Sequence, residues 1–496
     1  MSTVILISAV WALPLFGALA VRLFRSAERA RALAICLAAL TLAMAAVVFL
    51  RDAAQDAFTR SHADVAPILL GVRYHVGVDG LSAVLLPLAA LIGLAALLAA
   101  PRAELSPRTA AQILIAQGAV LGVLVSLDAL VLTLFWTLSL LPLRGELQRR
   151  GERAASAAFN VVFLGSTLPM ILFVVALGVL DYWSGGEGDR APFDLIRLSQ
   201  SGVLGSGPLA TLLGTLVLMG VLARMGCFPL HLWIPPLAAR GPGPLTLVSF
   251  ATPIGLFLLA RLAAPLFPGL GEQAMPLLLP LGLFSSIYGA VLALSQNDLR
   301  RLLGYFWMSQ QGFLLVGMAA WNTTSISGAL LHAISSVFCR SGLLLIAGAI
   351  AARTGTTDIR LLGGLITRGP RMATGFLLLS AAAVGFPGTL GFVSEDLLVQ
   401  GLLHTHGLAA AGLLVVTALN GILLYRAFKR TFLGPPSPHV QIMRGMEDFL
   451  PRERWVSVTL VVLLLLGGFA PAPLLAVRKG VVSALHRSES TIPSAH

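Results

Sequence analysis

Two stretches of this sequence decide the fold, LMGVLARMGCFPLHLWIPP (Leu218–Pro236) and LSAAAVGFPGTLGFVSEDLLV (Leu379–Val399). Both are apolar enough to lie in a bilayer, yet both carry helix-breaking residues near the middle. These are Gly226, Pro229, Gly385, Pro387 and Gly388. Because proline removes a backbone donor and clashes with the preceding turn, we expect both helices to be broken. An ordinary proline kink is the alternative.

The composition around these stretches is that of a membrane protein. Of the 496 residues, 57% are hydrophobic and 11% are charged, whereas soluble domains carry about 25% charged residues. Backbone polar groups in lipid are satisfied only by helices or closed barrels, and the long unbroken apolar runs lack the alternation of a barrel. We therefore expect an all-α, polytopic membrane protein whose main partner is the lipid bilayer.

Apolar runs of about 20 residues predict roughly fourteen transmembrane helices. Their expected centres lie near residues 13, 41, 90, 118, 136, 169, 218, 254, 285, 311, 338, 383, 416 and 466.

The basic residues indicate the orientation of these helices. If the N-terminus faces outside, 23 of the 34 Lys and Arg residues fall in inside loops and nine fall outside. This bias is typical of cytoplasmic loops, so it accounts for the net charge of +12 without nucleic acid. We expect a multi-pass protein of the cell inner (plasma) membrane with both termini outside. The other two bases, Arg224 and Arg340, lie within spans.

The chain offers no sign of a metal or a redox cofactor. Its three cysteines, Cys36, Cys227 and Cys339, lie singly in apolar stretches without CxxC or Cys/His clusters. We expect no metal, no cofactor and no catalytic residue in this chain.

The two expected breaks are separated by five spans, which suits two five-helix repeats of opposite orientation with an ion pathway between them. This predicts four segments: residues 1–108 with helices 1–3, residues 109–270 with the first repeat, residues 271–432 with the second, inverted repeat, and residues 433–496 with the last helix and tail.

A series of motifs then gives the chain a family resemblance. In order they are GVDGLS (77–82), FWTLSLLP (135–142), FPLHLWIPPLA (228–238), SQNDLRRLLGYFWMSQQG (295–312), GALLHAISSVFCRSGLLL (328–345), TTDIRLLGGL (356–365), GFPGTLGFVSEDLL (385–398), RAFKRTFLGP (426–435) and DFLPRERW (448–455). Each motif alone is weak, but the ordered set resembles the antiporter-like membrane subunits of respiratory complex I (the M, L and N chains of NADH-quinone oxidoreductase) and of Mrp-type cation/proton antiporters. The resemblance implies fourteen core helices, inverted repeats, broken seventh and twelfth helices, and a larger complex that moves protons or sodium.

The first half departs from the family's charge pattern. The resemblance puts Thr137 where the family has a glutamate and Arg224 where it has a lysine. Threonine cannot titrate, and arginine does not release its proton in practice, so no ordinary proton relay is expected here. Arg224 is either a fixed charge in the pathway or a clamp on a helix break, with Glu146 or freed carbonyls as candidate partners.

The family's next lysine, in the eighth span, corresponds to Pro253 here, counted back from Arg261. No ionisable residue lies between Thr246 and Ala260. The central relay is therefore expected to be interrupted as well.

The second half is better equipped. His332 matches a family histidine and lies two helical turns from Arg340, on the same face. Ser336 and Arg340 replace a second histidine and a lysine of the family. Glu395 lies where the family has lysine or glutamate; it exchanges protons with the outside, or it is only a carboxylate at a helix start. His231, beside the first break, passes protons to the cytoplasm or packs against aromatic rings.

These observations favour a membrane subunit of a complex I-like assembly that contributes to proton or sodium translocation driven by a partner's redox chemistry. Two alternatives stay open: an energising subunit of a non-redox transporter such as an inorganic-carbon uptake complex, and a proton-inert scaffold. Other membrane subunits are expected as partners in the first case.

Overall fold

The computed structural model describes residues 2–52, 61–69, 72–183, 192–201, 207–263, 266–442 and 447–475. Several bases counted for the orientation lie outside the described residues: Arg60, Arg190, Arg444, Arg478, Lys479 and Arg487.

The chain is almost entirely helical. Its helices are α1 (Ser2–Leu23), α2 (Ala27–Asp52), α3 (Gly80–Ala99), α4 (Pro107–Val125), α5 (Ala129–Leu138), α6 (Leu141–Arg149), α7 (Arg153–Trp183), α8 (Leu195–Ser201), α9 (Pro208–Met225), α10 (Ile234–Arg240), α11 (Gly243–Phe250), α12 (Ile254–Leu258), α14 (Pro268–Ser295), α15 (Leu299–Ala319), α16 (Thr323–Thr354), α17 (Pro370–Ala383), α18 (Leu390–Leu403), α19 (Gly407–Phe432), α20 (Pro438–Ile442) and α21 (Pro451–Phe469). Short helical turns η1 (Arg102–Glu104), η2 (Leu259–Ala263) and η3 (Leu365–Thr367) and the strands β1 (Ser61–Leu69) and β2 (Val72–Val78) complete the described part.

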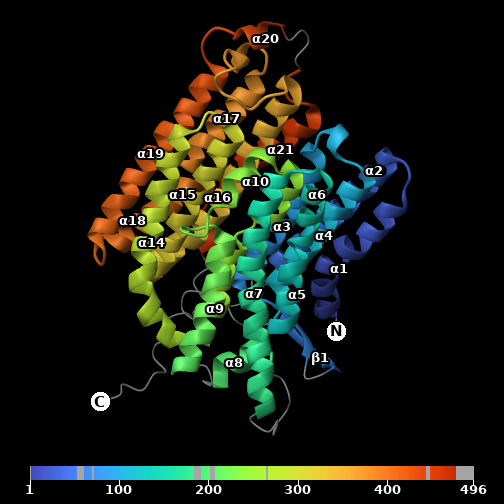
Figure 1. The fold of residues 1–496 in the computed structure, drawn as a ribbon, viewed down its shortest axis with the longest axis vertical. Coiled ribbons are helices and arrows are strands. Elements are labelled where there is room, and N and C mark those ends of the chain that lie inside the picture. Colours follow the sequence, from blue (N-terminus) through green and yellow to red (C-terminus); the bar gives the residue numbers. More distant parts are fainter. Residues whose placement is uncertain are drawn as a thin grey trace.

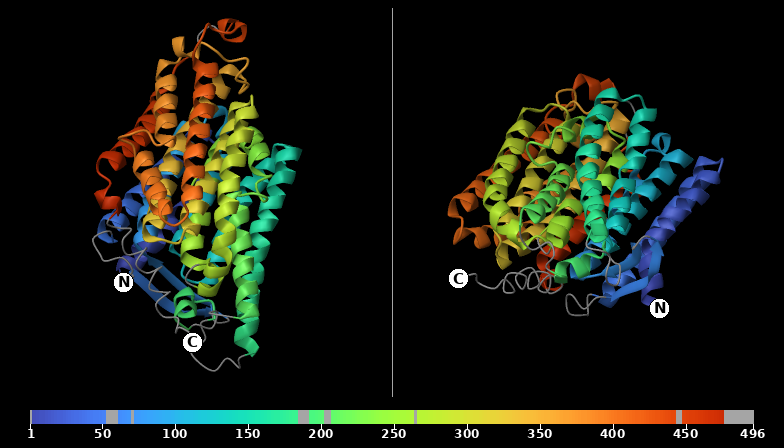
Figure 2. Two further views of the ribbon diagram at one scale, coloured as in Figure 1. Left: turned by 90° about the vertical axis from the view of Figure 1, so that its left-hand side faces the viewer. Right: turned by 60° about the horizontal axis from the view of Figure 1, so that its bottom comes forward.

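The long helices run side by side as one bundle (Figure 1). The start of α1, the β-hairpin and α8 lie at one end of the bundle, and α20 lies at the other (Figure 1). Helices α1 and α2 form one flank of the bundle, and α14 and α19 lie toward the opposite flank, as Figure 1 and the right-hand view of Figure 2 show.

Eleven helices of the described part are long and apolar enough to cross a membrane. Every expected span centre lies in a helix, although three of those helices or helix pairs fall outside the eleven because they are short or more polar. Large apolar side chains also face outward along the bundle, as lipid contact requires; Leu50 and Leu277 are each 71% exposed. The protein is a membrane-embedded, multi-pass, all-α chain.

Both expected helix breaks are present. Helix α9 ends at Met225, Gly226 adopts φ +74° as its C-cap, and the chain resumes as α10 only at Ile234. Helix α17 ends at Ala383, and α18 starts at Leu390 after a turn with positive φ at Gly385 and Gly388. The segment boundaries and the inverted relation of the repeats stay predictions.

Two features of the fold were not predicted. Strands β1 and β2 form an antiparallel hairpin between α2 and α3. The eighth span is also broken: α11 ends at Phe250, and α12 starts at Ile254 after Pro253. Sequence reasoning assigned helix breaks only where glycine and proline occur together, whereas Pro253 acts without a neighbouring glycine before it.

A buried carboxylate joins the hairpin to α8 at the end of the bundle where α1 begins. Asp194 accepts from His75 Nδ1 of β2 at 2.8 Å and from the backbone N–H groups of Ile196 and Arg197 at 2.9 and 3.0 Å. Burial alone would raise the pKa of this carboxyl, but donation from His75 and these amides outweighs it and holds the pKa below its usual range. Asp194 thus ties two loop elements together.

Replacing Gly226 with alanine is expected to destabilise the fold. An L-residue at this positive φ costs roughly 1–2 kcal/mol, and a Cβ there would lie 2.3 Å from Ile234 Cδ1. The melting temperature of the purified protein should fall. Gly421→Ala is the matched control, because a Cβ there meets nothing within 4 Å; equal melting temperatures for both variants would contradict the account.

The Asp194 junction predicts a pH-dependent contribution to stability. A carboxyl with a lowered folded pKa stabilises above its unfolded pKa, about 3.9, and loses that contribution as pH falls through the folded pKa. Asp194→Asn should therefore melt below the unsubstituted protein at neutral pH, and the gap should close as pH falls below about 4. A gap that is constant with pH would exclude a role of the ionised carboxylate.

Candidate functional site

Arg224 lies inside the bundle at the last turn of α9, and it is 4% exposed. Its Nη2 donates to Ser139 Oγ at 3.0 Å and to the Ser249 carbonyl at 2.9 Å. Its guanidinium stacks between the rings of Trp136 and Phe250, 5.0 Å from each centroid. The contacts of this cation are therefore hydroxyl, carbonyl and aromatic groups.

Arg340 on α16 is held in a similar way from the other side. Its Nη2 donates to the Ala251 carbonyl at 2.5 Å, and its guanidinium lies 4.7 Å from the centroid of Trp307. In the amide orientation that satisfies both neighbours, Gln311 Oε1 accepts from Arg340 Nη1 at 2.9 Å and from Trp307 Nε1 at 2.8 Å. The two arginines thus bind carbonyls that are two residues apart on one segment.

That segment is the unpredicted break of the eighth span. In a continuous helix the Ser249 carbonyl would accept from residue 253, but Pro253 has no N–H. Ala251 is the C-cap residue of α11, where carbonyls lack a partner within the helix. Arg224 and Arg340 donate to these carbonyls. The break therefore leaves two backbone acceptors without a helical donor, and each of them becomes a hydrogen-bond partner of a buried arginine.

Aromatic rings fill the space between the two arginines. Phe250 lies 4.4 Å from Trp233 and 5.6 Å from Trp307, and these two tryptophans lie 5.5 Å apart between ring centroids. All three rings are buried. They separate the two guanidinium groups with apolar surface.

The predicted partner Glu146 is wrong for Arg224. Glu146 lies on α6 and pairs instead with Arg149 at 2.5 Å and Arg150 at 2.9 Å. These bases are three and four residues ahead on the same chain, so the helix itself brings them to the carboxylate. In the described part of the chain, no carboxylate lies within ion-pair distance of Arg224 or Arg340.

Thr137 is half-buried on α5 and donates to the Thr133 carbonyl at 2.9 Å. It makes no bond to Arg224, which takes its hydroxyl partner from Ser139 instead. The position where the resemblance expects a glutamate is thus occupied by a hydroxyl that is satisfied within its own helix.

His332 lies at the break between α17 and α18, buried among three other helices. Its Nε2 bonds to Gln310 Oε1 of α15, and Gln310 Nε2 donates in turn to the Ala383 carbonyl at the end of α17. Its Nδ1 lies 3.3 Å from Ser394 Oγ on α18. The twelfth-span break is therefore connected by hydrogen bonds to a titratable group on α16.

Glu395 lies on the other side of the same break. Its carboxylate is buried on α18, accepts from Thr417 Oγ1 of α19 at 3.0 Å, and packs against Gly385 so closely that a Cβ there would lie 2.9 Å from Oε2. It lies beyond the first turn of α18, so it does not cap the helix; Thr389 does. This geometry favours a buried acid over an interfacial helix-start residue.

His231 packs against aromatic rings. It stacks on Phe228 and meets Tyr288 edge-on, with ring centroids 5.8 and 5.5 Å apart, in the turn between α9 and α10. Its contacts suit the aromatic-packing alternative. Asp396, the neighbour of Glu395, is exposed and accepts from Gln400 at 2.8 Å.

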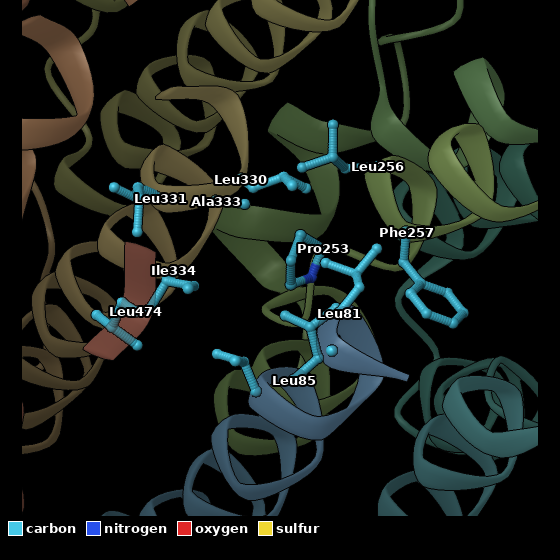
Figure 3. Close-up of a pocket in the computed structure, with 12 residues that line it drawn as sticks. Leu81, Leu85, Pro253, Leu256, Phe257, Leu330, Leu331, Ala333, Ile334 and Leu474 are labelled. Carbon is cyan, nitrogen blue, oxygen red and sulfur yellow. The ribbon is translucent and has the colours of Figure 1, made fainter. Parts of the chain in front are cut away.

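An apolar pocket borders the other side of the Pro253 break (Figure 3). Leu85 of α3, Pro253, Phe257 of α12 and Ile334 of α16 line it, and its lining side chains are all apolar. None of these side chains has a polar group that could bind a proton or coordinate an ion.

Sequence reasoning missed several polar groups that complete this site: Ser139, Ser249, Gln310, Gln311, Ser394 and Thr417. Neutral polar residues inside apolar spans were a usable signal, because unpaired polar groups in lipid are costly. The partner of each, however, lies on another helix, 22 and 85 residues away for the Thr417 and Ser139 contacts, and could not be deduced from spacing.

The family whose transmembrane model is described as NADH:quinone oxidoreductase/Mrp antiporter matches residues 126–420. The chain belongs to this family. This family membership confirms the resemblance expected from the ordered motifs.

Two named relatives align with most of the chain. The F(420)H(2) dehydrogenase subunit M of Methanosarcina mazei is 29% identical, with 82% of each chain covered. The NAD(P)H-quinone oxidoreductase chain 4 1 of Synechococcus elongatus is 30% identical, with 81% of this chain and 76% of the relative covered.

Solved structures share the antiporter-like fold. A chain of respiratory complex I from Thermus thermophilus with bound NADH superposes with a TM-score of 0.86 at 25% identity, over 97% of this chain and 99% of that one. A chain of the Mrp complex from Dietzia has a TM-score of 0.83 at 19% identity, over 97% and 98% of the two chains. The second likeness concerns the fold alone.

Removing the hydroxyl that binds Arg224 is expected to destabilise the site. Ser139→Ala takes an acceptor from a buried cation, which costs about 1.5–3 kcal/mol, and should lower the melting temperature. Ser295→Ala is the control, because Ser295 is exposed and donates only to Leu292; its effect should stay within about 0.5 kcal/mol. An equal loss in both variants would show that the Arg224 contact contributes nothing.

Proposed function

We propose that this chain is a membrane subunit of a complex I-like assembly that contributes to proton or sodium translocation driven by a partner's redox chemistry. The relatives support this proposal by their names, since they are subunits of quinone- or F(420)H(2)-linked oxidoreductases. The chain itself would carry no electrons. Other membrane subunits of the assembly are its expected partners.

The observation that carries the proposal is the break between α17 and α18. A histidine and a carboxylate, His332 and Glu395, are both buried there and bond to polar side chains of neighbouring helices. Titratable groups within a membrane are costly and mark ion or proton pathways. We assign proton transfer to this half, with Glu395 toward the outside, and a fixed-charge role to Arg224 and Arg340.

His231 is a weaker member of this pathway. Its ring is buried against Phe228 and Tyr288, and its Nδ1 has no hydrogen-bond partner in the described part of the chain. We keep it as the group that would pass protons toward the cytoplasm in the first half. The proposed setting is the cell inner membrane with both termini outside, and the four segments proposed are residues 1–108, 109–270, 271–432 and 433–496.

A specific observation favours a second candidate function. The first half lacks both members of the expected glutamate–lysine pair, since Thr137 and Arg224 stand there and Arg224 is fixed to Ser249. Such a loss suits an energising subunit of a non-redox transporter, of the kind found in inorganic-carbon uptake, or a proton-inert scaffold. Purification of the native complex distinguishes them: redox subunits support the first proposal, and a single large soluble partner supports the alternative.

Substitution of the buried acid tests the pathway itself. Glu395→Gln keeps the size and the bond to Thr417 but removes the titrating proton, so redox-driven proton flux in reconstituted vesicles should fall at least tenfold. His332→Ala should lower it as well. General acid–base groups commonly contribute factors of 10²–10⁴, which leaves room for such a loss.

Asp396→Asn is the matched control for that experiment. It neutralises the adjacent carboxylate, which is exposed and bonds only to Gln400 among the described residues, and flux should be unchanged. If Glu395→Gln and His332→Ala both translocate protons at the original rate, the proposed pathway is wrong. That result would support the proton-inert scaffold for this half of the chain.

A further inference from the structure

The second break holds a small cavity beside Arg340. Trp307 and Gln310 of α15, His332, Ser335, Ser336 and Arg340 of α16, and the end of α17 at Ala383 line it. The volume of the cavity is about 10 Å³, which is room for about one water-sized species.

The cavity faces an incompletely satisfied cation. Arg340 is 5% exposed, and its Nε lacks a hydrogen-bond partner among the described residues. The guanidinium uses its Nη groups on Ala251 and Gln311 and lies over the Trp307 ring. An arginine at membrane depth that has no acidic partner is costly.

The neighbouring histidine can also carry a positive charge, because each of its ring nitrogens faces an acceptor on the protein. The Gln310 amide nitrogen donates to Ala383, so its oxygen must accept, and His332 Nε2 is a donor. Ser394 donates its single hydroxyl hydrogen to the Gly391 carbonyl at 2.8 Å. His332 Nδ1 therefore meets an acceptor as well, and the network accommodates an imidazolium with hydrogen on both nitrogens.

Acidic groups are absent from the lining of this cavity. The buried acid of the same half, Glu395 on α18, bonds to Thr417 and has no ion pair with Arg340 in the described part of the chain. Cys339 is the remaining titratable group in the lining. The cavity thus combines a buried positive charge, an unused N–H donor and space for one small species.

We propose that this cavity binds one small monovalent anion of the chloride class, as the counterion of Arg340. The anion would accept from the unused Nε–H and neutralise a cation that has no ion-pair partner among the described residues. The proposal concerns a ligand site and does not depend on whether the chain translocates protons.

The test purifies the native complex that contains the full-length chain and measures its melting temperature in gluconate buffer. Chloride or bromide then replaces gluconate at constant ionic strength. Either halide should raise the melting temperature saturably, by roughly 2–4 °C. Ser336→Leu, which fills the cavity, and Arg340→Gln should both abolish the rise. Arg224→Gln, which removes an equally buried arginine away from the cavity, should keep it.

Anomalous scattering from bromide identifies the site even if the variants fail to fold. A bromide peak beside Arg340 Nε in the unsubstituted protein supports the proposal. No halide dependence, a dependence that survives Ser336→Leu, or a bromide-free cavity occupied by water alone would each overturn it.

Discussion

The arrangement of this bundle depends on the backbone that Pro253 leaves without a donor. A carbonyl with no partner is expensive in the interior of a membrane protein, and the break at the eighth span creates two such groups, at Ser249 and Ala251. Arginines from α9 and α16 bind them. Three helices are thereby fixed to one another at a single segment, and the aromatic rings of Trp233, Phe250 and Trp307 pack between the two contacts.

These two arginine contacts also bear on the chemistry expected of the first half. The resemblance puts Pro253 where the family has a lysine in the eighth span, and arginines from two neighbouring helices bind the carbonyls beside it. A guanidinium holds a planar, multiply bonded position that a flexible ammonium does not reproduce. The first half therefore combines strong structural contacts with little capacity to titrate, and the proposed proton chemistry falls to His332 and Glu395.

Sequence patterns predicted a large part of this structure because an apolar run of about 20 residues in lipid has to form a helix. The helix centres and the breaks at Gly226–Pro229 and Gly385–Gly388 follow from hydropathy and from glycine with proline. The hairpin did not, because a short extramembrane strand pair leaves no apolar run to detect. The eighth-span break did not either, since a lone proline is compatible with a kinked but continuous helix.

At the site, the sequence identified the buried ionisable residues but not their partners. Arg224 is buried, as expected, and the freed-carbonyl alternative was the right kind of partner, yet the carbonyl belongs to the eighth span and not to the seventh. Glu146 was a wrong partner because Arg149 and Arg150, three and four residues further along the chain, already form ion pairs with its carboxylate. Contacts between helices that lie 25 to 111 residues apart, such as Arg224 with Ser249 and Ser309 with Asn420, are set by tertiary packing alone.

The presence of arginines, and not lysines, at these two contacts has an electrical consequence. A lysine–glutamate pair changes its net charge as protons arrive and leave, so the local potential follows the working cycle. The guanidinium groups of Arg224 and Arg340 keep theirs throughout, and low-dielectric surroundings extend their field along the bundle. The centre of this protein therefore holds a positive potential that does not follow any protonation cycle: a cation that approaches it does work, and the same work is returned when the cation leaves.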